Sequence, residues 1–87
     1  MAEVWIPTPL LPMTGGEQRI IVPGKTVRQV VRNLVAQYPK LDGRLADGDE
    51  ILPGIAVIVD GETTTMGMLE PVQDDSEVHF LPAIGGG

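Results

Sequence analysis

Residues 26–38 form the most regular stretch of the chain and decide what kind of layer must lie beside it. Thr26 with Gln29 three residues later predicts a capping box at the start of a helix. Pro39 disfavours helical geometry at Tyr38 and predicts the end of the helix there. The apolar residues recur at intervals of three and four and so share one side: Val27, Val30, Val31, Leu34, Val35 and Tyr38. One apolar stripe needs one sheet face to cover it, so the sequence predicts a single helix packed on a sheet.

Short apolar segments on both sides of this helix supply the sheet. We predict strands at residues 2–7, 17–22, 55–59, 62–65 and 77–81. Three prolines, at positions 7, 9 and 12, forbid regular pairing after the first strand, and Thr14-Gly15-Gly16 supplies a turn. Residues 2–22 are therefore expected to form a β-hairpin with a long, proline-stiffened loop.

The segments between the strands give weaker signals. Residues 43–46 are expected to form a short helical turn, and the run at 55–59 is apolar enough for a strand buried on nearly both faces. Met68, Leu69 and Val72 are expected in the core.

The resulting order, β-β-α-β-β-β with one dominant helix at about residues 26–38, is typical of an α+β protein with the β-grasp (ubiquitin-like) fold. We expect a mixed sheet of four to five strands, with the last strand central and beside the first. Residues 1–82 would form this domain, and residues 83–87 a flexible C-terminal glycine tail.

Composition narrows the classes of function. The chain of 87 residues makes one small domain, and its six basic against twelve acidic residues give a net charge of -6. This charge argues against nucleic acid and anionic membranes as partners and favours a partner with a basic docking surface. Cysteine is absent, which excludes thiolate metal sites and cysteine nucleophiles. With no signal-peptide pattern and no apolar run near the roughly 20 residues of a membrane span, we expect a cytoplasmic protein.

Candidate catalytic motifs are weak. Gly24-Lys25-Thr26 resembles the end of a phosphate-binding loop, but Arg19 stands where that motif needs its first glycine, so a helix start is the better interpretation. His79 is the single histidine and is expected to be a solvent-side or cross-strand packing residue rather than a metal ligand. We therefore predict no autonomous active site, no metal and no cofactor bound by the domain itself.

The C-terminal segment from Leu81 to Gly87 is the most unusual part of the chain. Pro82 releases the chain from the last strand, and three consecutive glycines follow. Glycines carry no side chain and can place an unhindered carboxyl group in a narrow channel of another protein. The alternative is an ordinary frayed terminus.

An apolar docking patch beside this tail is a further candidate. Phe80, Leu81 and Trp5 are its expected members, because clustered exposed apolar groups mark interaction sites. The alternative is that the loop at residues 40–53 covers these side chains.

Three groups of residues make the chain resemble the ubiquitin-like sulfur carriers of the ThiS/MoaD family. They are Ile6-Pro7-Thr8-Pro9-Leu10 with Thr14-Gly15-Gly16, Val57-Ile58-Val59-Asp60-Gly61, and the closing run from Ser76 to Gly86. The closing run is the specific part, since it joins a strand to Leu-Pro-Ala and a terminal Gly-Gly. The resemblance covers essentially the whole chain.

This resemblance implies a carrier rather than an enzyme. An ATP-dependent adenylyltransferase of the ubiquitin-activating type would adenylate the carboxylate of Gly87, or of Gly86 if a processing metalloprotease trims the chain. A sulfur donor would then displace AMP to leave a thiocarboxylate. The tail that enters the partner's channel would consist of Pro82, Ala83, Ile84, Gly85 and Gly86.

The resemblance also implies a sulfur-accepting synthase as a second partner. The proline-rich opening looks most like carriers that feed a cysteine synthase; related carriers serve molybdopterin synthase, thiamin synthesis or tRNA thiolation. Two alternatives remain open: a ubiquitin-like modifier joined to lysines, and a plain interaction domain with incidental glycines.

Overall fold

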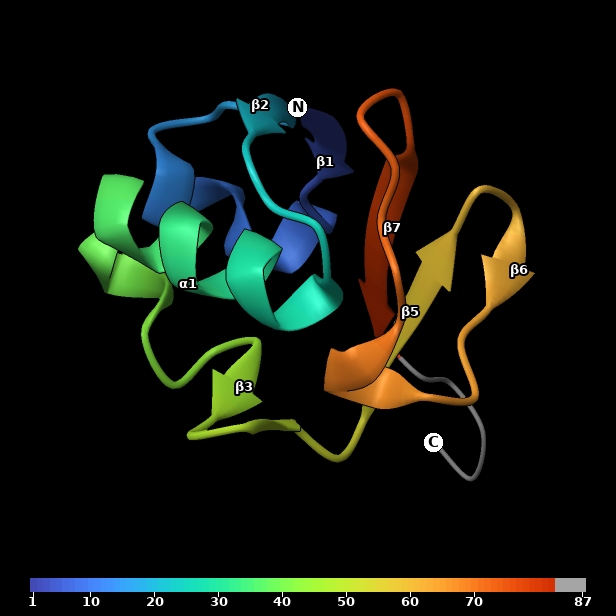
Figure 1. Ribbon diagram of the computed structural model, residues 1–87. Coiled ribbons are helices and arrows are strands. Elements are labelled where there is room, and N and C mark those ends of the chain that lie inside the picture. The colour runs from blue at the N-terminus through green and yellow to red at the C-terminus, as the bar shows by residue number, and fades with distance from the viewer. Residues whose placement is uncertain (83–87) are drawn as a thin grey trace.

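The computed structural model describes residues 1–82 and consists of a five-stranded mixed sheet with one α-helix across one face (Figure 1). The strands are β1 (Ala2–Trp5), β2 (Arg19–Val22), β5 (Ile55–Val59), β6 (Glu62–Thr63) and β7 (Glu77–Pro82), in the order β2-β1-β7-β5-β6. β7 runs parallel to β1 and antiparallel to β5. The last strand is therefore central and beside the first, as predicted.

The helix α1 (Val27–Gln37) matches the predicted stretch to within one residue at each end. The Thr26 hydroxyl accepts a hydrogen bond from the Gln29 N–H, which satisfies one of the free amides of the first turn. The Gln29 side chain does not return to Thr26 as a capping box would have it; it accepts from the Lys25 N–H at 2.9 Å. Both contacts hold the start of the helix.

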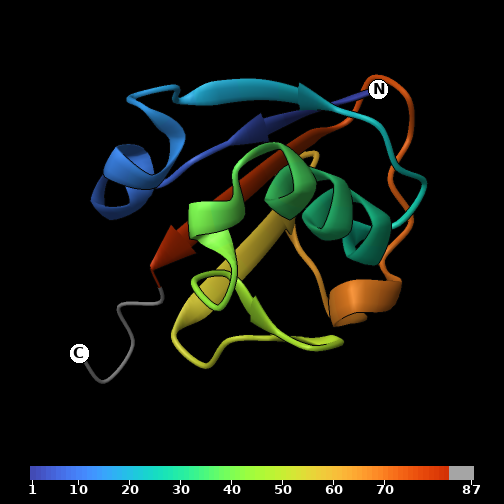
Figure 2. The ribbon, with the colours of Figure 1, turned by 90° about the vertical axis from the view of Figure 1, so that its left-hand side faces the viewer.

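Helix α1 lies across one face of the sheet (Figure 2), and its apolar stripe packs in the core as expected. Four of its members are buried, and Val35 and Tyr38 are half-buried at its edge. From the sheet, Val4, Val78 and Phe80 are fully buried beneath the helix. Each such aliphatic or aromatic side chain stabilises the fold by roughly 1.5–3 kcal/mol.

Gly24 is required where the chain enters α1. A Cβ at this position would lie 2.8 Å from both the backbone N and Cγ2 of Val30, and the residue has φ +154°. The backbone thus approaches the first turn of the helix too closely for a side chain. This confirms the interpretation of Gly24-Lys25-Thr26 as a helix start.

Two local predictions were wrong, whereas the predicted β-hairpin with its long proline-rich loop is confirmed, because β1 pairs antiparallel with β2. Residues 43–46 form no helical turn: the short 3-10 helix η2 (Pro39–Leu41) lies before them, turns follow it, and Ala46 already belongs to a second, two-stranded sheet, β3 (Ala46–Asp47) with β4 (Glu50–Ile51). Its turn depends on Gly48, which has φ +61°. The predicted proline-rich loop contains the 3-10 helix η1 (Thr8–Thr14), whose φ values proline suits.

The second error concerns Leu69. It lies in the 3-10 helix η3 (Gly67–Leu69), which turns Met68 into the core and leaves Leu69 66% exposed. Within residues 1–82, no helix is long and apolar enough to cross a membrane.

Candidate functional site

The central strand β7 ends where the C-terminal residues begin. Its last residue, Pro82, still pairs with Ile55 of β5. The strand is thus held in the sheet over its full length. Pro82 was predicted to release the chain from the last strand and to begin the segment, residues 82–86, that enters a partner's channel. The release was wrong, because Pro82 is the last residue of β7. Residues 83–87, predicted as a flexible glycine tail, lie outside the described residues, and their role stays a prediction.

Successive residues at the end of β7 point to opposite faces of the sheet. Phe80 is fully buried beneath α1, so its inclusion in the docking patch was wrong. Leu81 points the other way and is 41% exposed, and Trp5 is half-buried. Because side chains alternate along a strand, Phe80 and Leu81 cannot belong to one surface.

Trp5 and His79 form the centre of the sheet face opposite α1, called the outer face below. The two residues are register partners in the parallel β1–β7 pair. Their rings stack with centroids 5.1 Å apart and planes 6° apart. His79 is therefore a cross-strand packing residue, as predicted.

Charged side chains surround this stack. The indole N–H of Trp5 donates to Glu3 Oε1 at 3.0 Å, and the guanidinium carbon of Arg19 lies 5.5 Å from the centroid of the Trp5 ring. On the other side, His79 Nε2 lies 3.3 Å from Glu77 Oε1. These contacts fix the orientation of both rings and make a preformed surface.

Several apolar side chains lie on the rest of the outer face, and nothing else in residues 1–82 covers them. Ile58 pairs with His79 and Ala56 with Leu81, and both β5 residues are half-buried. Ile21 of β2 is 54% exposed. β5 was expected to be buried on nearly both faces, but only Val57, which points toward α1, is buried. For Ala56 and Ile58 the difference arises because nothing in residues 1–82 packs on the outer face; Ile55 and Val59, on the side of Val57, pack against the core but stay half-buried.

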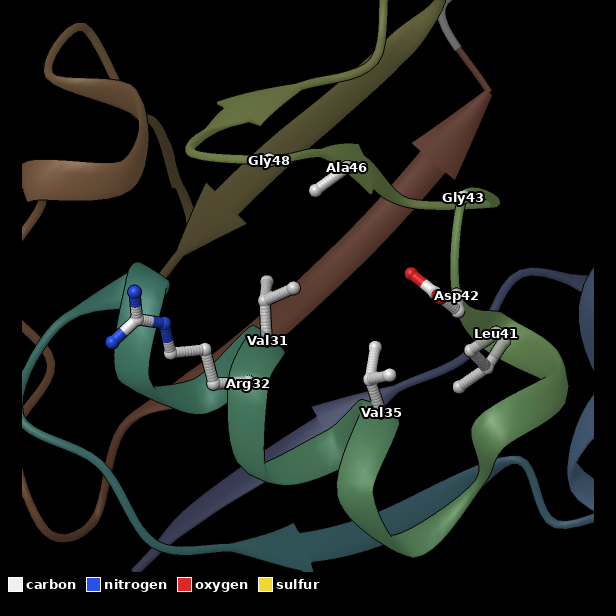
Figure 3. A pocket seen from close by; sticks show the side chains of 8 residues that line it. All are labelled: Val31, Arg32, Val35, Leu41, Asp42, Gly43, Ala46 and Gly48. Atoms are coloured by element: carbon white, nitrogen blue, oxygen red, sulfur yellow. The ribbon is translucent and has the colours of Figure 1, made fainter.

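The loop at residues 40–53 covers the other side of the molecule. Leu41 and Leu45 are fully buried in the core with α1. Figure 3 shows Val31 and Val35 of α1 pointing toward Ala46 across a small cavity of about 230 Å³. The alternative that this loop shields Trp5 and Leu81 is therefore wrong.

A hollow of about 290 Å³ lies at the C-terminal end of β7. Trp5, Pro7 and Pro9 line it from the β1 side, and Leu81 and Pro82 from the β7 side. It borders the point where the C-terminal residues begin. Among residues 1–82, no group of three or more His, Cys, Asp or Glu side chains is placed to hold a metal ion.

Sequence reasoning missed two parts of this site. The Trp5–His79 stack depends on the register of two strands at opposite ends of the chain, and a single sequence gives no signal for it. The hollow forms where the pairing between β1 and β7 ends. Its only sequence signal is the group of prolines after the first strand.

Comparisons with known proteins agree with this arrangement. The model of the ThiS family matches residues 4–87. The sulfur carrier protein CysO of Mycobacterium tuberculosis is 33% identical over 91 residues, covering 97% of this chain and 96% of CysO. Small archaeal modifier protein 3 of Haloferax volcanii is 34% identical over 64 residues, covering 71% of this chain and 70% of that protein.

A solved structure extends the likeness to the whole fold. A chain of the BexX/CysO complex of Amycolatopsis orientalis has a TM-score of 0.90 and 29% identity, with 100% of both chains covered. The β-grasp prediction is confirmed, and the relatives named here are carrier and modifier proteins rather than enzymes. The motifs at the two ends of the chain and the match over residues 4–87 lead to one conclusion: the chain belongs to the ThiS family.

Proposed function

We propose that the protein is a sulfur carrier whose C-terminal carboxyl group is converted to a thiocarboxylate. The observation that carries this proposal is the family match, which extends through Gly87 and thus includes the glycine run. The CysO relative, a sulfur carrier matched over nearly its full length, supports the same function.

In this proposal the activating enzyme catalyses both steps at the carboxyl group. A carboxylate oxygen of Gly87 attacks the α-phosphorus of ATP, pyrophosphate leaves, and an acyl-adenylate forms. Sulfide then attacks the carbonyl carbon, and AMP leaves with the oxygen that it received. The carboxyl group has exchanged one oxygen for sulfur, with no change of oxidation state. Gly86 takes this role if a metalloprotease removes Gly87.

The carrier contributes a firm base for its reacting end. β7 lies between β1 and β5 and pairs with β5 as far as Pro82, so the five residues that follow start from a fixed point. Glycine at positions 85–87 keeps side chains away from the reacting carbon. The partner's channel can then be narrow enough to exclude water from the adenylate.

We further propose that the activating enzyme docks on the outer face around Trp5 and Leu81. Around Leu81 this face carries apolar side chains that nothing else in residues 1–82 covers, and the charged Glu3, Arg19 and Glu77 lie around the Trp5–His79 stack. The net charge of -6 favours an enzyme with a basic rim around its docking surface.

Cysteine synthesis is the proposed destination of the sulfur. The CysO relative and the proline-rich opening support a synthase that accepts sulfur on an activated serine derivative. Molybdopterin, thiamin and tRNA thiolation remain alternatives. Supplying the thiocarboxylate form to each acceptor system separately, and measuring which acceptor gains sulfur, distinguishes them.

Intact-mass spectrometry tests the proposal. The protein is incubated with the ubiquitin-activating-type enzyme of its own organism, ATP and sulfide. We expect a gain of about 16 Da, the difference between oxygen and sulfur in the carboxyl group. The gain appears on the 87-residue chain if Gly87 reacts, and on the 86-residue chain if trimming comes first. No gain on either species would contradict the proposal.

A second function, conjugation to protein lysines, is favoured by the likeness to small archaeal modifier protein 3. The same acyl-adenylate would then react with a lysine amine instead of sulfide. Tagged protein expressed in its own host would form larger, thiol-resistant species that carry an isopeptide link to Gly87. A chain that ends at Gly85 is the control, because it lacks the reacting residue.

A further inference from the structure

β2 is a free edge of the five-stranded sheet. The strand order β2-β1-β7-β5-β6 gives β2 a single neighbour, and Figure 2 shows β2 (light blue) along the upper border of the molecule. The other edge strand, β6, has only two residues, Glu62 and Thr63. β2 has four residues and no proline within it, so it is the edge better suited to pair with another strand.

The hydrogen-bond pattern shows which main-chain groups of β2 are open. The antiparallel register that places Trp5 opposite Arg19 also places Ile6 opposite Gln18. The Ile6 N–H donates to the Gln18 carbonyl at 2.8 Å, so the even-numbered residues of this strand turn their N–H and C=O groups toward β1. Arg19 and Ile21 therefore turn theirs toward the open side, where no other segment of residues 1–82 bonds to them.

The open groups belong to exposed residues. Ile21 is 54% exposed, and the side chain of Arg19 is 62% exposed. Ile20 and Val22 alternate with them and are buried in the core. A second strand can therefore reach the main chain of Arg19 and Ile21 without displacing any side chain of the core.

The spacing of the open groups makes this edge complementary to itself. Two copies of β2 can lie antiparallel with Ile20 of one copy opposite Ile20 of the other. Arg19 of each copy then lies opposite Ile21 of the other, and both are open positions. Each such pair exchanges two main-chain hydrogen bonds, so the two pairs form four. This register is symmetric about Ile20, as a two-fold dimer requires.

The side chains at this register also fit a second copy. On the outer face, the aliphatic stem of Arg19 would cover Ile21 of the other copy, which is otherwise exposed. Ile21 lies opposite Glu3 within its own chain, so the guanidinium would also come near the Glu3 carboxylate of the other copy. The same edge thus supplies both the cation and the anion of an ion pair between copies, and this charge complementarity favours a second copy as the occupant.

We propose that the protein self-associates through β2, forming a sheet that is continuous through two copies. The two-fold axis is perpendicular to the sheet, so both α1 helices lie on one side and both outer faces on the other. β1 separates each β7 from the interface, and the two β7 strands run in opposite directions. Both C-terminal segments and both surfaces around Leu81 therefore stay available, and the inference does not rest on the proposed function.

Sedimentation equilibrium and amide hydrogen exchange over one concentration series test the self-association. Physiological salt screens the net charge of -6, which opposes association. We expect the average mass to rise from one chain toward two in the millimolar range, because an interface this small is weak. The Arg19 and Ile21 amides should become protected over the same range. The Ile20 and Val22 amides face β1, should be protected throughout, and are the internal control.

Two results of this series would overturn the proposal. One is the mass of a single chain at millimolar concentration. The other is a dimer whose Arg19 and Ile21 amides exchange as fast as in the dilute protein, because the copies would then meet at another surface.

Ile21→Pro removes the open N–H from each copy at a position where an edge strand tolerates proline. Two of the four hydrogen bonds are lost, so the dissociation constant should rise at least about fivefold. Thr63→Pro is the matched control on β6: the Thr64 N–H donates to the Val57 carbonyl, so the Thr63 N–H also points away from the sheet. This control should associate like the unchanged protein. Equal dissociation constants for the two folded proline variants would refute pairing through β2.

Ile21→Lys tests the register with the N–H retained, and it carries the test if Ile21→Pro does not fold. The added ammonium group would lie opposite Arg19 of the other copy, and like charges directly opposite destabilise a strand pair. Ile21→Thr is the uncharged control with a side chain equally suited to a strand. We expect weaker association for Ile21→Lys than for Ile21→Thr, and equal association would refute the register.

Discussion

Trp5 and His79 stack across the β1–β7 pair, with their ring centroids 5.1 Å apart and their planes 6° apart. The contact joins the first strand of the chain to the strand that leads into the C-terminal residues. It lies three residues before Pro82 and at the centre of the proposed docking surface. The stacked rings thus stabilise β7 at the last residue that pairs with β1.

Replacing His79 by alanine should lower the free energy of unfolding by about 0.5–1.5 kcal/mol, the value of an aromatic pair beyond its buried area. Trp5 is the only tryptophan, so its fluorescence reports both the stack and the unfolding transition. We expect a red-shifted emission in the folded variant, because the ring becomes more accessible to water. His79→Phe keeps a stacking partner and should retain most of the stability. Identical emission in the alanine variant and the unchanged protein would contradict the stack.

Replacing Leu34 by alanine should cost about 2–5 kcal/mol of unfolding free energy, because the side chain is fully buried and its removal leaves a cavity. Leu69→Ala is the matched control. This leucine is 66% exposed, so its truncation should change stability by no more than about 0.5 kcal/mol. Urea denaturation measures both, and equal costs at the two positions would refute the assigned core.

Gly24→Ala should destabilise the protein more than Gly43→Ala. Both glycines have positive φ, so both substitutions strain the backbone. Only at Gly24 would the added Cβ also meet Val30, at 2.8 Å, whereas nothing lies within 4 Å of a Cβ at Gly43. The difference between the two midpoints should correspond to about 1–3 kcal/mol, the usual cost of overpacking. A Gly43 variant as unstable as the Gly24 variant would show that backbone strain alone decides the cost.

The helix and the order of the elements along the chain could be predicted because their sequence signals are local. Thr26 caps α1, and Pro39 follows the residue that ends it, so both ends are visible in the sequence. The apolar run around Val57 and the alternation through Val78 also mark their strands without tertiary information. β3 and β4 have two residues each, and a segment this short shows neither the alternation of a strand nor the three-to-four-residue spacing of a helix.

The site was less predictable because it depends on register. Alternation shows that Phe80 and Leu81 face opposite ways, but the choice of the outward one depends on which face meets α1. The partners Trp5 and His79 are far apart in sequence, and their pairing results from the parallel β1–β7 ladder.

Leu81→Asp should weaken docking of the activating enzyme without unfolding the carrier. Leu81 is 41% exposed on the outer face, so a carboxylate there is tolerated in the free protein but opposes an apolar contact. A central contact should cost more than 1 kcal/mol, or more than about fivefold in KM for the carrier. Leu69→Asp is the control, since this exposed leucine lies in η3, away from the outer face. Equal KM values for the two variants would contradict docking around Leu81.

Gly87→Ala should leave folding unchanged and impair activation. The substitution lies outside residues 1–82, which contain the whole sheet and α1, so the midpoint of thermal unfolding should not move. A methyl group beside the reacting carbon crowds both the attack on ATP and the attack by sulfide, so thiocarboxylate formation should slow by at least about tenfold, equivalent to 1.4 kcal/mol. Ala83→Gly changes the same segment far from the carboxyl and should react normally. The rate of the mass gain compares the unchanged protein with the two variants. Normal activation of Gly87→Ala would refute the need for a side-chain-free end. If the reacting chain proves to end at Gly86, the same loss must be seen for Gly86→Ala.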